Sequence, residues 1–404
     1  MDPAAAARAI TPSEAPPLST AERDRRWNAV RGLLEREQAD ALVIAGPSAT
    51  RADLRYLSHA PAWADAPQWM VFPRAGVPQL IARPGHFESS PSAWIANAIE
   101  VAVSPGGTVI EVLRTLRVPN RRIAIAGLAG DDDWASVPAG FVAGLREAMP
   151  GIELVDLGQS LRSLRAIKSE EEIGVLAHAA SLLDAAYAQI DRVARPGLTA
   201  HELWAAGVGE LCRLGSELST HNRWASAARP RALARPAHGV LPSGHIVACE
   251  LEAVVAGYAT RAIHARAIGP TGPVLPALYA IVGELWEHTI AAVQPGTALR
   301  ALERELRTRT SRLVAPHGPL KSASAWLTLQ GSGLGADLPA LSGTSTGKLN
   351  DQPIEIGWVC SLGIALRADA EGRQYVASWS DPIVVTTRGS ARLGARPPGS
   401  FPTG

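Results

Sequence analysis

The chain of 404 residues is long enough for two domains with separate cores, and its hydrophobic share of 47% is ordinary for a globular protein. Its formal net charge of +1 provides no overall field, so we expect neither nucleic acid nor a membrane surface as a partner. The three cysteines, Cys212, Cys249 and Cys360, are far apart, which excludes a disulfide framework and a paired-cysteine metal clip.

The start of the sequence predicts a tail. Residues 1–19 are rich in Ala and Pro and lack the apolar region of a signal peptide, so we expect a flexible segment there. No hydrophobic run reaches about 18 residues, so no membrane span is expected. Together these features predict a cytoplasmic protein.

Alternating helix and strand patterns over 20–160 predict an amino-terminal α/β domain. It should begin with an amphipathic helix at 20–38, capped by Thr20, and a buried strand at 39–46. A β-hairpin turning at 74–76 follows. The remaining expected elements are strands at 121–130 and 151–158 and a helix at 141–150.

A second domain is expected over 161–395, followed by a tail at 396–404. Ser169 precedes three glutamates and should cap a long helix, because acidic residues in the first turn complement the helix dipole. Thr199 and Glu202 form a capping box for the next helix. Two further helices at 275–293 and 297–314 and a β-rich segment at 325–390 complete this domain.

The stretch 244–269, GHIVACELEAVVAGYATRAIHARAIG, predicts two strands with a tight return. Glu250 and Glu252 are two residues apart, so both should point to one face of the first strand. Arg261 and His264 follow on the second strand. Because burying charge is costly unless it is paired, this hairpin is either a solvated face or the floor of an active site.

Several phrases along the chain occur in an order that resembles the creatinase, aminopeptidase P and prolidase family over about residues 20 to 395. The phrases are LRAIKSEEEI, ARPGLTAHEL, GHIVACELEAVVAGY, QPGTALRALE, QGSGLG, GWVCSLG and DPIVVTTRGSARL. The resemblance implies an α+β fold, with a creatinase-type α/β domain followed by a pita-bread domain. It also implies a homodimer in which the amino-terminal domain caps the partner's site.

Most members of this family hold two divalent metals with two Asp, one His and two Glu. In family order, these positions fall on Glu250, Arg261, Ser332, Gly363 and Ser380. Glu250 keeps a carboxylate, but Arg261 carries a fixed positive charge and cannot be a ligand. We therefore expect no metal. The glycine-rich GSGLG at 331–335 does not open a helix after a strand, so no dinucleotide or other cofactor is expected.

The resemblance also implies catalytic residues, because the creatinase branch lacks metals and hydrolyses a C–N bond with a His and Glu residues. His238 corresponds to that His and is the predicted general acid and base, the alternative being a loop histidine satisfied by the backbone. The creatinase glutamates fall on Ile263 and Gly363, so creatine itself is not the expected substrate. Arg261, also predicted to be catalytic, either holds a substrate carboxylate or forms a structural pair with Glu250, and Glu250 is expected to orient a cationic group or a water molecule.

The other predicted substrate-binding residues are His264, Glu252, Arg223, Trp224, Tyr258, Trp63 and Asp65. By strand parity, His264 reaches the face of Glu250 only if no bulge intervenes. His221 belongs with Arg223 and Trp224 to the phrase THNRW, which lines the pocket or caps a helix end. Trp63 and Asp65 fall in the segment that, by resemblance, reaches the partner subunit.

These residues predict a metal-independent, creatinase-like enzyme acting on a small amino-acid-like, amide or guanidino substrate, with C–N bond hydrolysis as the first hypothesis. One alternative is a metal-free lyase, dehydratase or cyclase of a specialised biosynthetic pathway. Another is an inactive pseudo-peptidase that binds a ligand or a partner protein. The substitutions at the metal positions argue against ordinary Xaa-Pro peptidase activity.

Overall fold

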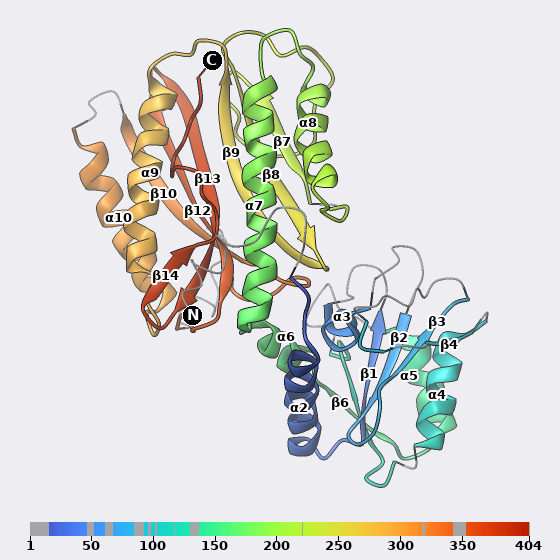
Figure 1. The fold of residues 1–404 in the computed structure, drawn as a ribbon. Coiled ribbons are helices and arrows are strands. Elements are labelled where there is room, and N and C mark those ends of the chain that lie inside the picture. Colours follow the sequence, from blue (N-terminus) through green and yellow to red (C-terminus); the bar gives the residue numbers. More distant parts are fainter. Residues whose placement is uncertain are drawn as a thin grey trace. The chain divides into compact units, whose positions relative to one another are not determined.

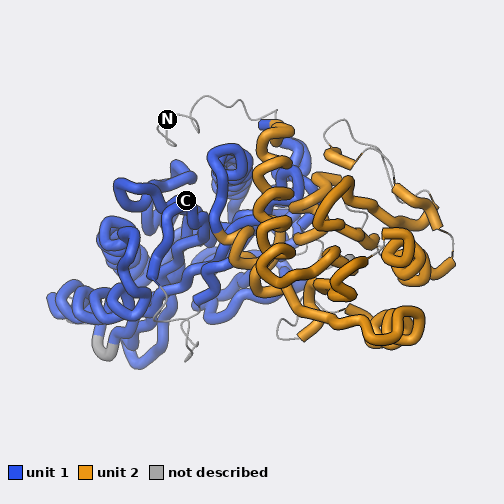
Figure 2. The backbone as a smooth tube through the Cα atoms, turned by 90° about the horizontal axis from the view of Figure 1, so that it is seen from below, with its two compact units in different colours: residues 1–16, 167–333, 338–404 blue, residues 17–166, 334–337 orange. Residues whose placement is uncertain are grey.

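The computed structural model describes residues 16–46, 52–60, 68–84, 93–95, 98–101, 103–116, 118–129, 137–219, 221–316, 320–341 and 353–403. These residues form two compact units, which Figure 2 shows in different colours. The amino-terminal unit contains Pro17–Ala166 and Leu334–Asp337, and the carboxy-terminal unit contains Ile167–Gly333 and Leu338–Gly404.

The amino-terminal unit is a mixed sheet in the order β4-β3-β2-β1-β5-β6, with helices on both faces (Figure 1). Its strands are β1 (Ala41–Gly46), β2 (Gln68–Pro73), β3 (Gln79–Ala82), β4 (Ala98–Glu100), β5 (Arg122–Ile125) and β6 (Glu153–Asp156). Its helices are α2 (Thr20–Arg36), α3 (Ala52–Ser58), α4 (Pro105–Thr115), α5 (Ala139–Ala148) and α6 (Gly158–Ala166). Leu42 and Ile44 point into one core and Val43 into the other, as strand alternation requires.

The carboxy-terminal unit is built on a second sheet, in the order β11-β10-β12-β13-β9-β8-β7, with β14 paired to β13. Its strands are β7 (Arg223–Ala227), β8 (His245–Val255), β9 (Tyr258–Ile268), β10 (Lys321–Gly331), β11 (Ala340–Leu341), β12 (Val359–Ala370), β13 (Arg373–Thr386) and β14 (Gly389–Arg392). Its helices are α7 (Glu170–Val193), α8 (Ala200–Arg213), α9 (Val274–Ala292) and α10 (Leu299–Val314).

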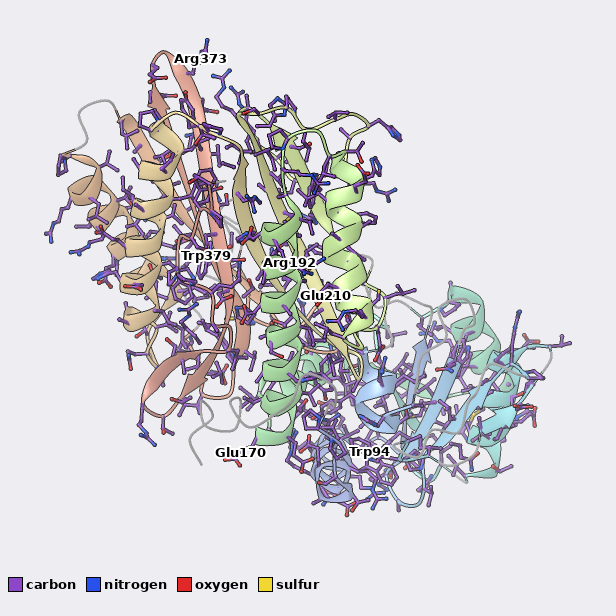
Figure 3. All side chains as sticks on the ribbon, turned by 45° about the horizontal axis from the view of Figure 1, so that its top comes forward. Trp94, Glu170, Arg192, Glu210, Arg373 and Trp379 are labelled. Atoms are coloured by element: carbon purple, nitrogen blue, oxygen red, sulfur yellow. The ribbon has the colours of Figure 1, made fainter. Side chains whose placement is uncertain are left out.

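The helices of this unit cover one face of the sheet, with α7 over β8 and β9 and α9 over β12 and β13 (Figure 1). Trp379 of β13 lies on this helix face, where its ring meets Trp286 of α9 edge-on at 4.9 Å between centroids (Figure 3). We call the opposite side of the sheet the open face. This arrangement confirms the predicted α+β fold with two successive domains.

Local signals set the helix starts as the sequence predicted. Ser169 and Thr199 each accept a hydrogen bond from the third residue of their helix, and Glu172 and Glu202 return the bond, so both capping boxes are complete. The first helix differs by one residue, because Ser19 rather than Thr20 is the cap of α2. Cys249 and Cys360 are buried, and Cys212 is exposed.

The unit boundaries differ from those predicted. The first unit extends to Ala166 rather than to residue 160, because Leu161 of α6 packs into its core. The tail expected at 396–404 is instead packed as far as 403: Phe401 stacks on Tyr279, and Pro402 accepts a hydrogen bond from the Ala267 amide. Of the predicted amino-terminal tail, residues 1–15 lie outside the described residues, whereas Leu18 is buried.

Helix α7 is the long helix that Ser169 was expected to cap, and it is strongly apolar. Among the described helices it is the one whose length and composition would allow it to cross a membrane, and 61% of that stretch is buried inside the unit. It packs against β8, β9 and α8. Burial on several sides explains its apolar character, since a helix enclosed in a core is hydrophobic around most of its surface.

Candidate active site on the open face

The register of the central hairpin decides which charged residues meet. Glu250 lies opposite Ile263 and Glu252 opposite Arg261, while Arg223 of β7 lies opposite Glu250 on its other side. Residues directly opposite in an antiparallel pair share a face. Arg223, Glu250, Glu252 and Arg261 therefore all lie on the open face.

The same row continues into the other half of the sheet. Ile263 lies opposite Ser380, Ser380 opposite Gly363, and Gly363 opposite Thr328. The Ile263 amide donates to the Ser380 hydroxyl at 2.8 Å, which fixes the junction of β9 and β13. The register thus aligns residues 250, 363 and 380, three of the positions at which the resemblance implies metal ligands, in one row.

Arg261 is held by several neighbours. Its Nη2 forms a 3.0 Å ion pair with Oε2 of Glu252, and its Nη1 donates to Gln330 at 3.3 Å. The second oxygen of Glu252 accepts from the Ser219 hydroxyl at 2.7 Å. The guanidinium is therefore fixed between β8, β9 and β10, and the predicted partner Glu250 is replaced by Glu252.

His221 lies between the acidic and basic groups of this face. Its Nε2 is 3.1 Å from Oε2 of Glu250 and also 3.1 Å from Nη1 of Arg261. A guanidinium only donates and a carboxylate only accepts, so this nitrogen accepts from Arg261 in one tautomer and donates to Glu250 in the other. A side chain that can take both roles beside a carboxylate has the chemistry of a general acid and base.

His238, rather than His221, was the predicted general acid and base. His238 is exposed, and its ring stacks on His201 of α8 with centroids 4.8 Å apart, while the hydrogen bond to Glu250 comes from His221. A signal for His221 was present: it precedes Arg223 by two residues, so the same alternation that places Arg223 beside Glu250 carries His221 to that face.

Three other predicted site residues lie on the wrong face. His264 is paired with Cys249 and is hydrogen-bonded to Asp191 of α7 at 2.9 Å, and burial lowers the pKa of its imidazole. Trp224 is also opposite Cys249 and is buried. Tyr258 is buried and donates to Glu172 of α7 at 3.0 Å. All three support the packing of the helices on the sheet.

Trp63 and Asp65 lie outside the described residues, so their predicted role at the site has no structural counterpart here. Glu250, Glu252, Arg261 and Arg223 are the predicted residues that the structure brings together. Of these, Arg223 is the most exposed, with Nε 3.9 Å from Oε2 of Glu250.

The positions at which the resemblance implies metal ligands are Glu250, Arg261, Ser332, Gly363 and Ser380. Glu250 is the one acidic side chain among them, and Arg261 places a cation beside it. A Cβ at Gly363 would come within 2.3 Å of Oγ1 of Thr328, so this position also has no room for a longer side chain. Among the described residues, no group of three or more His, Cys, Asp or Glu side chains is arranged to hold a metal ion.

A second charged cluster lies directly behind this site, on the helix face. Arg396 donates to Asp381 at 2.8 Å and to the carbonyls of Ser380 and Ile263 at 2.8 and 3.2 Å, and it forms a 3.4 Å ion pair with Asp184. Burial, with the nearby charge of Asp381, raises the pKa of Asp184 to about 6. This guanidinium joins β9 and β13 at the residues behind the candidate site.

Both domains match models of known protein families. The family model for metallopeptidase family M24 matches residues 175–387, and that for the creatinase/prolidase N-terminal domain matches residues 26–167. An uncharacterized peptidase of Bacillus subtilis, YqhT, is 26% identical over 265 residues, which cover 64% of this chain and 70% of that protein.

Solved structures share the fold at lower sequence identity. The X-Pro aminopeptidase of Thermotoga maritima superposes with a TM-score of 0.73 at 17% identity, covering 94% of this chain and 99% of the other. The Xaa-Pro dipeptidase of Bacillus anthracis gives the same TM-score at 18% identity, with the same coverage. These similarities confirm the two-domain pita-bread architecture.

Proposed function

The chain belongs to metallopeptidase family M24, and we propose that it is a metal-independent member of this family acting by acid–base catalysis. The substrate class that suits the site is a small amino-acid-like, amide or guanidino compound, and the reaction is hydrolysis of a C–N bond. The observation that carries the proposal is the position of Arg261, whose guanidinium lies 3.0 Å from Glu252 and 3.1 Å from His221.

A fixed cation at this point changes the chemistry of the site. In relatives, metals would activate a water molecule and polarise the substrate. Here Arg261 supplies positive charge without an open coordination position, so proton transfer has to come from side chains. His221 and Glu250, 3.1 Å apart, are the pair on the open face that can move a proton.

Elemental analysis of the purified protein tests the metal claim. We expect less than stoichiometric binding of divalent metal and unchanged activity after treatment with a chelator. About two tightly bound divalent ions per subunit, or activity that disappears with the chelator and returns with one metal, would overturn the claim.

A variant of His221 tests the catalytic claim. We expect His221→Gln to lower kcat/KM roughly 10²- to 10⁴-fold for any amide or guanidino compound that the protein turns over, because it removes the proton-transferring group. The matched control is His201→Gln, which replaces the histidine stacked on His238 and should leave kcat/KM unchanged. Equal effects of the two changes would contradict the assignment.

Labelled water identifies the reaction. Hydrolysis incorporates one ¹⁸O atom from the solvent into the product, whereas a lyase, dehydratase or cyclase incorporates none at the bond that breaks. If a broad panel of amides and guanidino compounds shows no turnover while ligands still bind, the protein is an inactive binding member of the family. The homodimer and the cytoplasmic location remain predictions, and light scattering after size-exclusion chromatography would test the first.

A further inference from the structure

Glu250 has one carboxylate oxygen without a protein donor. Its Oε2 contacts His221 at 3.1 Å and has Nε of Arg223 at 3.9 Å, whereas its Oε1 has no hydrogen-bond partner in the described part of the chain. Although the Glu250 side chain is only 7% exposed, its Oε1 is accessible to solvent. Glu252 differs, because Ser219 and Arg261 occupy both of its oxygens.

Arg223 offers the matching positive charge. It lies opposite Glu250 in the register of β7 and β8, so the two backbones hold the side chains next to each other. Its side chain is 53% exposed, and its distance of 3.9 Å from Glu250 is too long for a hydrogen bond. Among the described residues, its two Nη atoms have no partner, so the planar fork that binds carboxylates is available.

We propose that Glu250 and Arg223 together bind a free α-amino acid group, with the ammonium on Oε1 of Glu250 and the carboxylate on the Nη atoms of Arg223. The ligand would replace one loose ion pair by two charge-assisted hydrogen bonds, which are stronger than neutral ones. Because the protein groups are only 3.9 Å apart, the ligand's two charges must be close, as they are on a single carbon.

This assignment moves the carboxylate from Arg261 to Arg223. Arg261 is already bound to Glu252 and Gln330 and contacts His221, and its side chain is only 22% exposed. The inference rests on the proposed function in so far as both use the same site, and it narrows the substrate to compounds with an unblocked amine and an unblocked carboxylate. Blocked amino acids and internal peptide segments lose one or both anchors.

Calorimetric titration with amino acids tests the proposal without requiring turnover. The probes are the twenty standard L-amino acids, one at a time, followed by the N-acetyl and carboxamide derivatives of the tightest binder. We expect at least one free amino acid to bind, and each derivative to bind roughly 10- to 100-fold more weakly, as loss of a hydrogen bond to a charged group implies. Absence of binding by all twenty would overturn the proposal.

Variants assign each end of the ligand. Arg223→Ala should weaken the free amino acid roughly 10- to 100-fold and leave its carboxamide unchanged, and Arg223→Lys should restore part of the loss. Glu250→Gln should weaken the free amino acid and the carboxamide but not the N-acetyl derivative. The control is Arg213→Ala, which breaks the exposed ion pair with Glu210 on α8 (Figure 3) and should change nothing.

The outcomes separate this inference from the proposed function. If amino acids bind with this pattern but are never turned over, the proposed catalytic activity is refuted, whereas the amino-acid-binding role of Glu250 and Arg223 is supported. If turnover depends on His221 but is unchanged by Arg223→Ala, the proposed catalytic activity is supported, whereas the amino-acid-binding role of Arg223 is refuted. Unchanged melting temperatures would show that each variant is folded. We expect this of the Arg223 variants, because that side chain is exposed.

Discussion

The two faces of the central sheet carry similar charges but use them differently. On the helix face, Arg396 is buried with Asp381 and Asp184 and also binds two main-chain carbonyls. On the open face, Arg261 is similarly engaged, but Arg223 and one oxygen of Glu250 are not. Charge that is buried among opposite charges and main-chain carbonyls maintains the fold, whereas the partly solvent-exposed Arg223 and the unpaired oxygen of Glu250 are accessible to a ligand.

This difference predicts that substitutions on the helix face mainly change stability, whereas substitutions on the open face mainly change ligand binding. The following variants test that division, and the expected effects on the free energy of unfolding decrease from one to the next.

Loss of Arg396 should have the largest effect. Arg396→Ala leaves the buried Asp381 with Arg392 alone, 3.2 Å from its other oxygen, and removes a donor from two main-chain carbonyls, so we expect the free energy of unfolding to fall by about 3 kcal/mol in urea titrations. Arg388→Ala, on the exposed turn between β13 and β14, should stay within about 0.5 kcal/mol of the wild type. A loss of less than about 1 kcal/mol at Arg396 would show that this cluster is not a structural brace.

A methyl group at Gly363 should have an intermediate effect. The new Cβ would lie 2.3 Å from Oγ1 of Thr328 and 3.3 Å from Cβ of Ser380, so Gly363→Ala should cost about 1–3 kcal/mol by overpacking. Removing the hydroxyl in the double variant Gly363→Ala with Thr328→Ala should recover most of this loss. A neutral single variant would mean that this part of the open face can accommodate larger side chains.

The pH dependence of stability should report Asp184. Its pKa is about 6 in the folded protein, above the usual value of 3.8, so its contribution to stability is present below about pH 3.8 and is lost as pH rises through 6. Asp184→Asn does not titrate and can still accept from the Ala395 amide. Relative to wild type, this variant should gain on the order of 1–2 kcal/mol between pH 4 and pH 7. Parallel pH profiles of the two proteins would contradict the assignment.

The Glu252 and Arg261 pair should give the smallest effect. A double-mutant cycle with Glu252→Gln and Arg261→Met should yield a coupling of about 0.5–1 kcal/mol, because the guanidinium is partly exposed and solvent screens the pair. The same cycle measured on amino acid binding should show little coupling if Arg223 is the carboxylate anchor. A large coupling in binding would indicate that Arg261, rather than Arg223, binds the ligand carboxylate.

The positions of the histidines depend partly on tertiary structure. Alternation with Arg223 indicates the face of His221, but no local pattern indicates where the loop carries His238. Its position depends on the path of the loop between β7 and β8, which carries His238 to His201 of α8. His264 was predictable in principle, because β8 and β9 are joined by the two-residue turn of Ala256 and Gly257. With a two-residue turn, an even-numbered residue of β8 lies opposite an odd-numbered residue of β9. Glu250 therefore shares its face with Ile263, and His264 lies on the other face.

The sequence by itself determined the local geometry of this protein. Alternation placed Glu250 and Glu252 on one face, the two capping boxes started α7 and α8, and the order of motifs indicated the family and its fold. These features depend on neighbours within a few residues. Only the tertiary structure decided which charges are paired, because Arg261, His221 and Arg223 reach the site from separate strands and a loop. The hairpin of charged residues thus proved to have one face that stabilises the fold and one that remains open to a ligand.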